Sequence, residues 1–309
     1  MPGLPDVHPR PGLPEAVSVY EVGPRDGLQA EPKTVPVAAK LELINRLGDA
    51  GLAAIEATSF VSPTWVPQLA DAEEVMAGLD RRPGVRYPVL TPNQRGFDRA
   101  VAAGADEVAV FVSATETFAA RNLNTTVEGA LAMAAAVINQ AQARGLPVRG
   151  YVSMVFGDPW EGRVEAEQAA AVTARLFALG CSTISLGDTI GVATAGQVQT
   201  VLQAVAAAGV PLAQVALHLH DTYGQALANV LAGLESGVRE FDASAGGLGG
   251  CPYAKSATGN LATEDLVWML DGLGIQHGVD LHAVVRTSRW LADRLGRPSP
   301  SRVVAALAG

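Results

Sequence analysis

The stretch from residue 183 to residue 221 reads TISLGDTIGVATAGQVQTVLQAVAAAGVPLAQVALHLHD and contains the repeating unit of the fold. Residues 183–186 and 214–219 are short runs rich in β-forming side chains, and residues 195–208 between them form a longer amphipathic segment. The helical segment is followed by Gly209-Val210-Pro211, a combination that ends helices. This order predicts a β-strand, a helix and then the next β-strand.

The same unit recurs along the chain. Eight strands are expected, at residues 17–22, 52–57, 85–90, 107–112, 148–155, 183–186, 214–219 and 238–243. Amphipathic helical stretches lie between them, at residues 38–50, 127–144, 165–179 and 195–208. Eight strand–helix units in 309 residues predict a fold of the α/β class, a closed (β/α)8 TIM barrel. An open doubly wound sheet is the alternative, but no Gly-x-Gly-x-x-Gly motif follows the first strand.

The segments outside the eight units complete the domain organisation. Residues 1–15 carry five prolines and no apolar run, and we expect them to form a flexible N-terminal arm. Residues 16–309 are expected to form a single barrel domain, in which the stretch from about 263 to 308 adds C-terminal helices. Thr263-Glu264-Asp265 resembles a helix start with acidic residues in its first turn.

Composition excludes several classes of protein. A hydrophobic content of 49% argues against disorder, and a net charge of -9 argues against a nucleic-acid partner. No uninterrupted apolar stretch reaches the roughly 20 residues of a membrane helix, so no membrane partner is expected. The two cysteines, Cys181 and Cys251, do not make a disulfide framework, and the N-terminal stretch resembles no targeting peptide. We therefore expect a cytoplasmic protein, with Cys181 assigned to packing.

Polar side chains gather where the predicted strands end. In a TIM barrel, the carboxyl ends of the strands form the active site. The residues at or just beyond these ends are Glu21, Arg25, Asp26, Gln29, Glu56, Ser59, Asp188, His218, His220, Asp221, Cys251 and Asn260. Their shared position at one rim of the barrel predicts a functional site.

His218 and His220 are the most informative pair in this set. Residues i and i+2 of a strand point to the same side, so both imidazoles can face the barrel mouth and bind one metal ion. The alternative is a pair of polar residues at a strand end, one of which caps the next helix. Asp26 adds a carboxylate at the same rim, and the amide oxygen of Asn260 is a further candidate ligand. Mixed nitrogen and oxygen ligands suit Mg²⁺ or Mn²⁺, with Zn²⁺ as an alternative.

Three other residues are candidates for the chemistry around such an ion. Arg25 either forms a surface salt bridge or directs its guanidinium at negative charge that develops on an oxygen. Glu56 and Asp188 would be costly as buried charges, so we expect them to orient Arg25 or a histidine, with simple structural pairing as the alternative. Cys251 lies in a glycine-dense loop, which predicts a lid that brings a thiol over the site; an inert small side chain is the alternative.

Five segments carry a resemblance to a known family. The chain is similar to the hydroxymethylglutaryl-CoA lyases from about residue 17 to about residue 295. The segments that carry the similarity are EVGPRDGLQ (21–29), IEATSFVSP (55–63), SLGDTIG (185–191), GGCPYA (249–254) and TGNLATEDLV (258–267).

The resemblance implies a site and an activity. A divalent cation, Mg²⁺ or Mn²⁺, would be bound by Asp26, His218, His220 and Asn260. The family's catalytic arginine and loop cysteine match Arg25 and Cys251, its supporting acids match Glu56 and Asp188, and His218 is also implicated in proton transfer. The implied reaction is metal-dependent cleavage of 3-hydroxy-3-methylglutaryl-CoA to acetoacetate and acetyl-CoA, by a homodimer. We expect the acyl-CoA substrate to contact Arg25, Gln29, Ser59 and Asn122.

Two other activities and one inactive alternative remain open. A condensing acyltransferase of the same superfamily, such as an isopropylmalate or homocitrate synthase, usually has Arg-Asp-Gly-Glu-Gln after the first strand, where this chain has Leu28. A lyase for a longer branched acyl-CoA would share the same core. A barrel that only binds acyl-CoA or a partner protein is least favoured, because every proposed metal-binding and proton-transfer position is filled.

Overall fold

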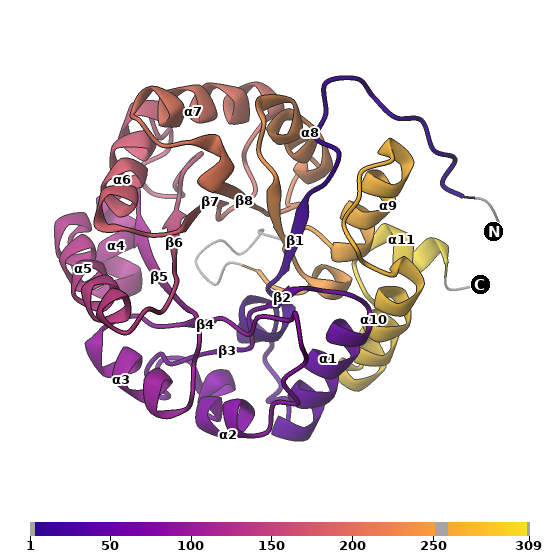
Figure 1. Cartoon of the computed structure of the whole chain (residues 1–309), viewed down its shortest axis with the longest axis horizontal. Helices are drawn as coiled ribbons and strands as arrows, with labels where there is room; N and C mark the ends of the chain where they lie inside the picture. The colour runs from indigo at the N-terminus through magenta and orange to yellow at the C-terminus, as the bar shows by residue number, and fades with distance from the viewer. Residues whose placement is uncertain (1–3, 251–258, 308–309) are drawn as a thin grey trace.

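The computed structural model describes residues 4–250 and 259–307. In these residues nine short strands form one parallel sheet that curls around on itself (Figure 1). The sheet has the order β2-β1-β9-β8-β7-β6-β5-β4-β3. The strands are β1 (Ser18–Glu21), β2 (Ala54–Ile55), β3 (Thr58–Ser59), β4 (Val89–Leu90), β5 (Val108–Ser113), β6 (Val148–Ser153), β7 (Thr183–Asp188), β8 (Val215–Leu219) and β9 (Glu240–Ala243).

The barrel closes through the run that contains β2 and β3. Only Glu56 and Ala57 separate these two strands. The backbone amides of these two residues donate hydrogen bonds to neighbours on opposite sides. The Glu56 amide donates to the Glu21 carbonyl at 2.8 Å, and the Ala57 amide donates to the Pro88 carbonyl at 2.9 Å. The predicted eight-stranded barrel is therefore confirmed, with its second strand divided in two.

The fourth structural strand is shorter than the prediction for residues 85–90. Only Val89–Leu90 pair as a strand, because Pro88 has no N–H to donate to a neighbouring strand. Arg86 forms an isolated parallel bridge with Ala54 before the proline, and the Val89 amide donates to the Glu107 carbonyl at 3.2 Å after it, so the proline interrupts the pairing of this run. The strand prediction was therefore right in position and too long in extent.

Helices surround the barrel, and the four predicted helical stretches are confirmed to within one residue at each end. Figure 1 shows the last three helices standing together at one side of the ring, between α1 and α8. The predicted C-terminal helices are thus present. The helices are α1 (Val37–Asp49), α2 (Ala72–Ala77), α3 (Gln94–Ala102), α4 (Glu116–Leu123), α5 (Val127–Ala143), α6 (Ala166–Leu179), α7 (Ala195–Ala207), α8 (Ala226–Ser236), α9 (Thr263–Leu273), α10 (Leu281–Leu295) and α11 (Arg302–Ala306).

The apolar core lies between the barrel and its helices. Leu43, Ile44 and Leu47 of α1, for example, are at most 1% exposed. The interior of the barrel differs from this layer, because it holds charged and aromatic side chains such as Arg149 and Tyr20. The guanidinium carbon of Arg149 lies 4.0 Å from the centre of the Tyr20 ring. The polar barrel interior provides the floor of the candidate site described below.

The N-terminal arm runs as an extended segment along the outside of the barrel domain, toward α9 (Figure 1). The His8 amide donates to the Gly272 carbonyl at 2.8 Å, and the Gln276 amide donates to the Glu15 carbonyl at 2.9 Å. The flexibility expected for this arm stays a prediction. Over the described part of the chain, no helix combines the length and the apolarity needed to cross a bilayer.

Candidate active site

Arg25 and Asp26 lie on a single π-helical turn, η1 (Gly23–Gly27), which follows β1 directly. The two glycines of this turn allow it to pack tightly against the loop after β9. A Cβ atom on Gly27 would lie 2.7 Å from Ser244 Oγ, and real Cβ atoms do not approach other atoms so closely. The local sequence therefore fixes the two functional side chains at the carboxyl end of the barrel.

Arg25 is buried, at 6% exposed, and two carboxylates hold its guanidinium. Its Nε donates to Glu56 Oε2 at 2.7 Å, and its Nη1 donates to Asp26 Oδ1 at 2.6 Å. Burial alone would lower the pKa of Arg25, but Glu56 and Asp26 raise it above its ordinary value, so the side chain stays cationic. The predicted contact between Glu56 and Arg25 is present.

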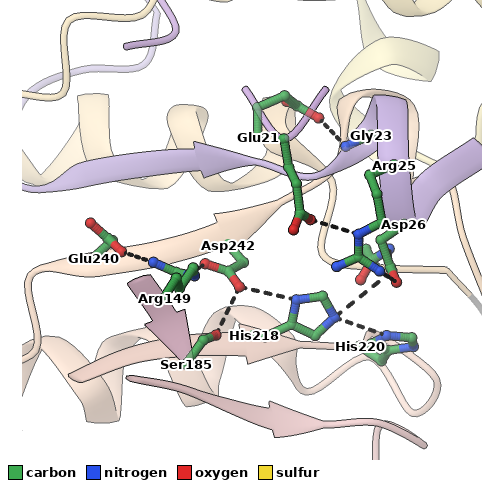
Figure 2. A network of polar contacts seen from close by, with 12 residues as sticks. Glu21, Gly23, Arg25, Asp26, Arg149, Ser185, His218, His220, Glu240 and Asp242 are labelled. Carbon is green, nitrogen blue, oxygen red and sulfur yellow. Dashed lines mark hydrogen bonds and ion pairs between the residues drawn. The ribbon is translucent and has the colours of Figure 1, made fainter. Parts of the chain in front are cut away.

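Three side chains converge beside Arg25 (Figure 2). One ligand atom from each of Asp26, His218 and His220 lies within 4.8 Å of the others. His218 Nε2 is 3.3 Å from His220 Nε2 and 3.9 Å from Asp26 Oδ2. The i and i+2 spacing of the two histidines at the end of β8 therefore directs both imidazoles to one point, as predicted.

Asp26 is held as a carboxylate at this point. Burial alone would raise its pKa, but Arg25, His218 and His220 lower that pKa well below its usual range. Asn260 Nδ2 donates to Asp26 Oδ2 at 2.8 Å and to the Leu248 carbonyl at 2.9 Å. Asn260 Oδ1 is buried and has no hydrogen-bond partner within the described residues, which leaves an oxygen donor at the site.

These donors fit a divalent cation. Two imidazole nitrogens and a carboxylate oxygen lie within coordinating reach of a common point, with an amide beside them. Mixed nitrogen and oxygen ligands of this kind suit Mg²⁺, Mn²⁺ or Zn²⁺. The arrangement also places a fixed cationic donor, Arg25, next to the cation site.

Asp188 and Ser59 both accept hydrogen bonds from backbone amides of the loops that follow their strands. The Asp188 carboxylate accepts the amides of Val192 at 2.9 Å and Ala193 at 3.1 Å, and burial raises its pKa to about 6. Asp188 is not among the described residues that line the cavity, whereas its neighbour Gly187 is, but Asp188 still interacts electrostatically with His218, which acts to lower its pKa. These two hydrogen bonds support the loop after β7. Ser59 is fully buried, and its hydroxyl accepts the Val61 amide at 3.3 Å.

A cavity of about 400 Å³ opens above the charged cluster. Its floor includes Arg25, Asp26, His218 and His220, and Gln29 and Asn122 also line it. Ser59 is not among the described residues that line it. Apolar side chains make up much of the remaining wall, among them Val61, Trp65, Leu90, Phe111, Phe118 and Leu123. The Cys251 prediction lies outside the described residues.

Comparison with known proteins decides the family. The model of the HMGL-like family matches residues 16–291. The chain belongs to this family. Chicken (Gallus gallus) mitochondrial hydroxymethylglutaryl-CoA lyase is 53% identical over 291 residues, which cover 94% of this chain and 97% of the relative. The mouse (Mus musculus) cytoplasmic 3-hydroxy-3-methylglutaryl-CoA lyase is 51% identical, over 96% of this chain and 86% of the relative.

Solved structures agree with this assignment to the HMGL-like family. The hydroxymethylglutaryl-CoA lyase of Pseudomonas aeruginosa matches with a TM-score of 0.94 and 49% identity, over 96% of this chain and 99% of that chain. A lyase from Acinetobacter baumannii, solved with coenzyme A and 3-methylmalate, matches with a TM-score of 0.91 and 41% identity, over 95% of both chains. The carboxyl transferase domain of Rhizobium etli pyruvate carboxylase shares only the fold, at 20% identity and a TM-score of 0.65.

The site of this HMGL-like chain contains residues that the sequence reasoning missed. Asp242 of β9 lies beside His218, with its Oδ2 3.2 Å from His218 Nδ1. Tyr151 lines the cavity, and its ring lies edge-on to His218 with the centroids 6.2 Å apart. The available signal was strand alternation: Tyr151 shares an inward face of β6 with Arg149, and a buried arginine requires acids nearby.

Two buried acids support the turn η4 (Ala245–Gly247), which lies shortly before Cys251 in the sequence. The Gly246 amide donates to both Glu264 oxygens, at 3.1 and 3.0 Å, and the Ser288 hydroxyl also donates to Glu264. The Ala245 amide donates to Glu21 Oε1 at 2.9 Å. Burial raises the pKa of Glu264 to about 8 and that of Glu21 to about 7.

Glu264→Gln is expected to change how stability depends on pH. The folded-state pKa of Glu264 is about 8, above the ordinary 4.5, so the proton stabilises the folded chain. This contribution is complete below about pH 4.5 and is lost as pH rises to about 8, with a slope of up to about 1.4 kcal/mol per pH unit. Urea unfolding of both proteins should therefore show the variant gaining stability relative to wild type as pH rises. Glu167→Gln, on the exposed face of α6, is the control, and its stability difference from wild type should not change with pH. A Glu264→Gln stability difference that also does not change with pH would contradict the prediction.

Proposed function

We propose that the chain is a hydroxymethylglutaryl-CoA lyase, which cleaves 3-hydroxy-3-methylglutaryl-CoA into acetoacetate and acetyl-CoA. The observation that carries the proposal is the convergence of Asp26, His218 and His220 beside the buried guanidinium of Arg25. Relatives that carry this name match nearly the whole chain at about half identity. The activity is thus supported both by the family and by the residues that the reaction needs.

Asp26, His218, His220 and Asn260 are the residues that would hold a divalent cation, and we favour Mg²⁺ or Mn²⁺. A cation bound there supplies Lewis acidity, which lowers the pKa of the tertiary hydroxyl of the substrate. The orphan oxygen of Asn260 and the ionised Asp26 both suit a hard cation. Zn²⁺ remains the alternative that metal analysis of the purified protein would test.

Arg25 stabilises the charge that forms during cleavage. A base removes the hydroxyl proton of the substrate, the C2–C3 bond breaks, and its electron pair moves to the thioester as an enolate. The guanidinium donates hydrogen bonds to that enolate oxygen and is held in place beforehand by Glu56 and Asp26. A proton is then delivered to C2, which gives acetyl-CoA. His218 and Cys251 are the candidate proton carriers, and either assignment satisfies the balance of protons.

The cavity suits a thioester of coenzyme A. Its charged floor would bind the hydroxyl and carboxylate of the acyl group, and its apolar wall would contact the 3-methyl group and the pantetheine arm. Gln29 and Asn122 line the cavity, and we propose that they hydrogen-bond the substrate. The relative from Acinetobacter baumannii was solved with coenzyme A and 3-methylmalate, which supports this choice of ligand. We also propose that the protein is cytoplasmic and that it forms a homodimer. Sedimentation of the purified protein would test the homodimer.

The purified protein is expected to release acetoacetate from 3-hydroxy-3-methylglutaryl-CoA only when a divalent cation is present. EDTA should abolish the release, and added Mg²⁺ or Mn²⁺ should restore it, because three of the four proposed ligands approach a common point. Acetoacetate can be measured by coupling its reduction to NADH oxidation. Release that is unaffected by EDTA would contradict the proposed metal dependence.

A small substrate panel separates the alternatives. Substrates with a longer 3-alkyl group test for a lyase of wider specificity, and acetyl-CoA with 2-oxo acids tests for a condensing acyltransferase. We expect 3-hydroxy-3-methylglutaryl-CoA to give the highest kcat/KM. Condensation without cleavage would overturn the proposed function.

A further inference from the structure

We propose that Asp242 is a positioning residue that fixes the tautomer and the orientation of His218, so that His218 Nε2 is available to bind the cation. The inference rests on the proposed metal-dependent function for the cation and on the geometry of the barrel interior for everything else. Figure 2 shows Asp242 between His218 and Arg149, on the side of the imidazole away from Asp26.

The register of the barrel places the two side chains together. His218 and Asp242 are paired residues of the parallel strands β8 and β9, so their side chains lie next to each other on the inner face. Asp242 Oδ2 lies 3.2 Å from His218 Nδ1 and accepts the Ser185 hydroxyl at 2.8 Å. The side chain of Asp242 is fully buried, so water does not compete for these bonds.

Arg149 holds the Asp242 carboxylate from the opposite side. Its Nη2 donates to Asp242 Oδ1 at 2.5 Å, and its Nη1 donates to Glu240. The guanidinium carbon of Arg149 lies 4.0 Å from the centre of the Tyr20 ring and 5.2 Å from the centre of the Tyr151 ring. A charged donor packed between two aromatic rings cannot easily turn away, so the position of the carboxylate is fixed.

The fixed carboxylate decides which nitrogen of His218 carries the proton. Asp242 Oδ1 accepts from the buried Arg149 guanidinium and Oδ2 accepts from the Ser185 hydroxyl, so Asp242 is held as a carboxylate, which can only accept hydrogen bonds. His218 must then donate through Nδ1–H. In the neutral imidazole, Nε2 is then left with a lone pair, and this is the nitrogen that faces Asp26 and His220. The same arrangement of carboxylate, histidine and metal orients ligands at many metal sites.

A purely structural role for Asp242 would predict a different result. Neutralising Asp242 removes the charge partner of the buried Arg149 and lowers stability in either case. Loss of stability therefore does not distinguish a positioning role toward His218 from a purely structural role. The tautomer of His218 and the affinity for Mn²⁺ do distinguish them. The chain has five histidines, few enough to assign each imidazole by NMR.

The test combines NMR of ¹⁵N-histidine-labelled, metal-free protein with Mn²⁺ titration followed by EPR of the free ion. In wild type, His218 is expected as the Nδ1–H tautomer. In Asp242→Asn, the amide can donate to Nδ1, so the Nε2–H form should appear and Mn²⁺ affinity should fall by at least about 10-fold. Glu240→Gln is the matched control, because it removes the other acid of Arg149 and leaves Asp242 in place. It should keep the wild-type tautomer and change Mn²⁺ affinity by less than about 3-fold.

The outcomes separate this inference from the proposed function. An Nε2–H tautomer for His218 in metal-free wild type would overturn the inference, and this measurement does not depend on whether Asp242→Asn folds. If wild type binds Mn²⁺ and folded Asp242→Asn binds it equally well, the inference alone fails. If wild type does not bind Mn²⁺, the proposed metal-dependent function fails with it.

Discussion

Arg25→Met is expected to lower kcat by at least about 100-fold, because it removes the fixed donor to the enolate oxygen that forms as the C2–C3 bond breaks. The methionine keeps an apolar stem of similar length in a buried position. Glu56 would lose its partner, but burial already raises the pKa of Glu56, so its carboxyl group can take up a proton rather than remain as an unpaired charge. The variant should therefore fold and retain its affinity for Mn²⁺.

The measurement is steady-state acetoacetate release together with Mn²⁺ titration of the same preparations. Arg25→Gln should behave like Arg25→Met, because neither side chain carries the charge. Arg163→Met is the control, since the Arg163 side chain is 81% exposed and forms a surface ion pair with Glu165. Near-normal turnover in either Arg25 variant would refute the proposed role.

The main features of the fold follow from local patterns in the sequence. Eight strand runs and four of the helical stretches between them can be recognised from their own residues. The division of the second strand was not predictable in this way. Glu56 and Ala57 bond to neighbours on opposite sides of the barrel, and only the three-dimensional closure of the sheet determines that arrangement.

The candidate site shows the same division between local and long-range information. The shared direction of His218 and His220 follows from their spacing along one strand. The contact between Arg25 and Glu56 follows from the meeting of strand ends at one rim. The hydrogen bonds of Asp188 to the Val192 and Ala193 amides depend on the path of the loop after β7, which no local pattern determines. Asp242 was missed because its pairing with His218 depends on the register between β8 and β9.

His220→Ala is expected to weaken Mn²⁺ binding by more than about 100-fold, because a direct ligand should cost more than the 10–100-fold typical of residues that only orient ligands. His220 separates metal binding from proton transfer better than His218 does, since metal binding is the only role proposed for it. Acetoacetate release at micromolar Mn²⁺ should be undetectable. His282→Ala, exposed on α10, is the matched control and should leave both readouts unchanged.

Excess Mn²⁺ distinguishes the loss of a ligand from the loss of a catalytic donor. Asp26 and His218 still converge in His220→Ala, so millimolar Mn²⁺ should restore part of the turnover by occupying the weakened site. The same addition should not rescue Arg25→Met, whose cation site is intact. Rescue of both variants, or of neither, would mean that the two residues do not divide the work as proposed. Wild-type Mn²⁺ affinity in His220→Ala would remove His220 from the cation site altogether.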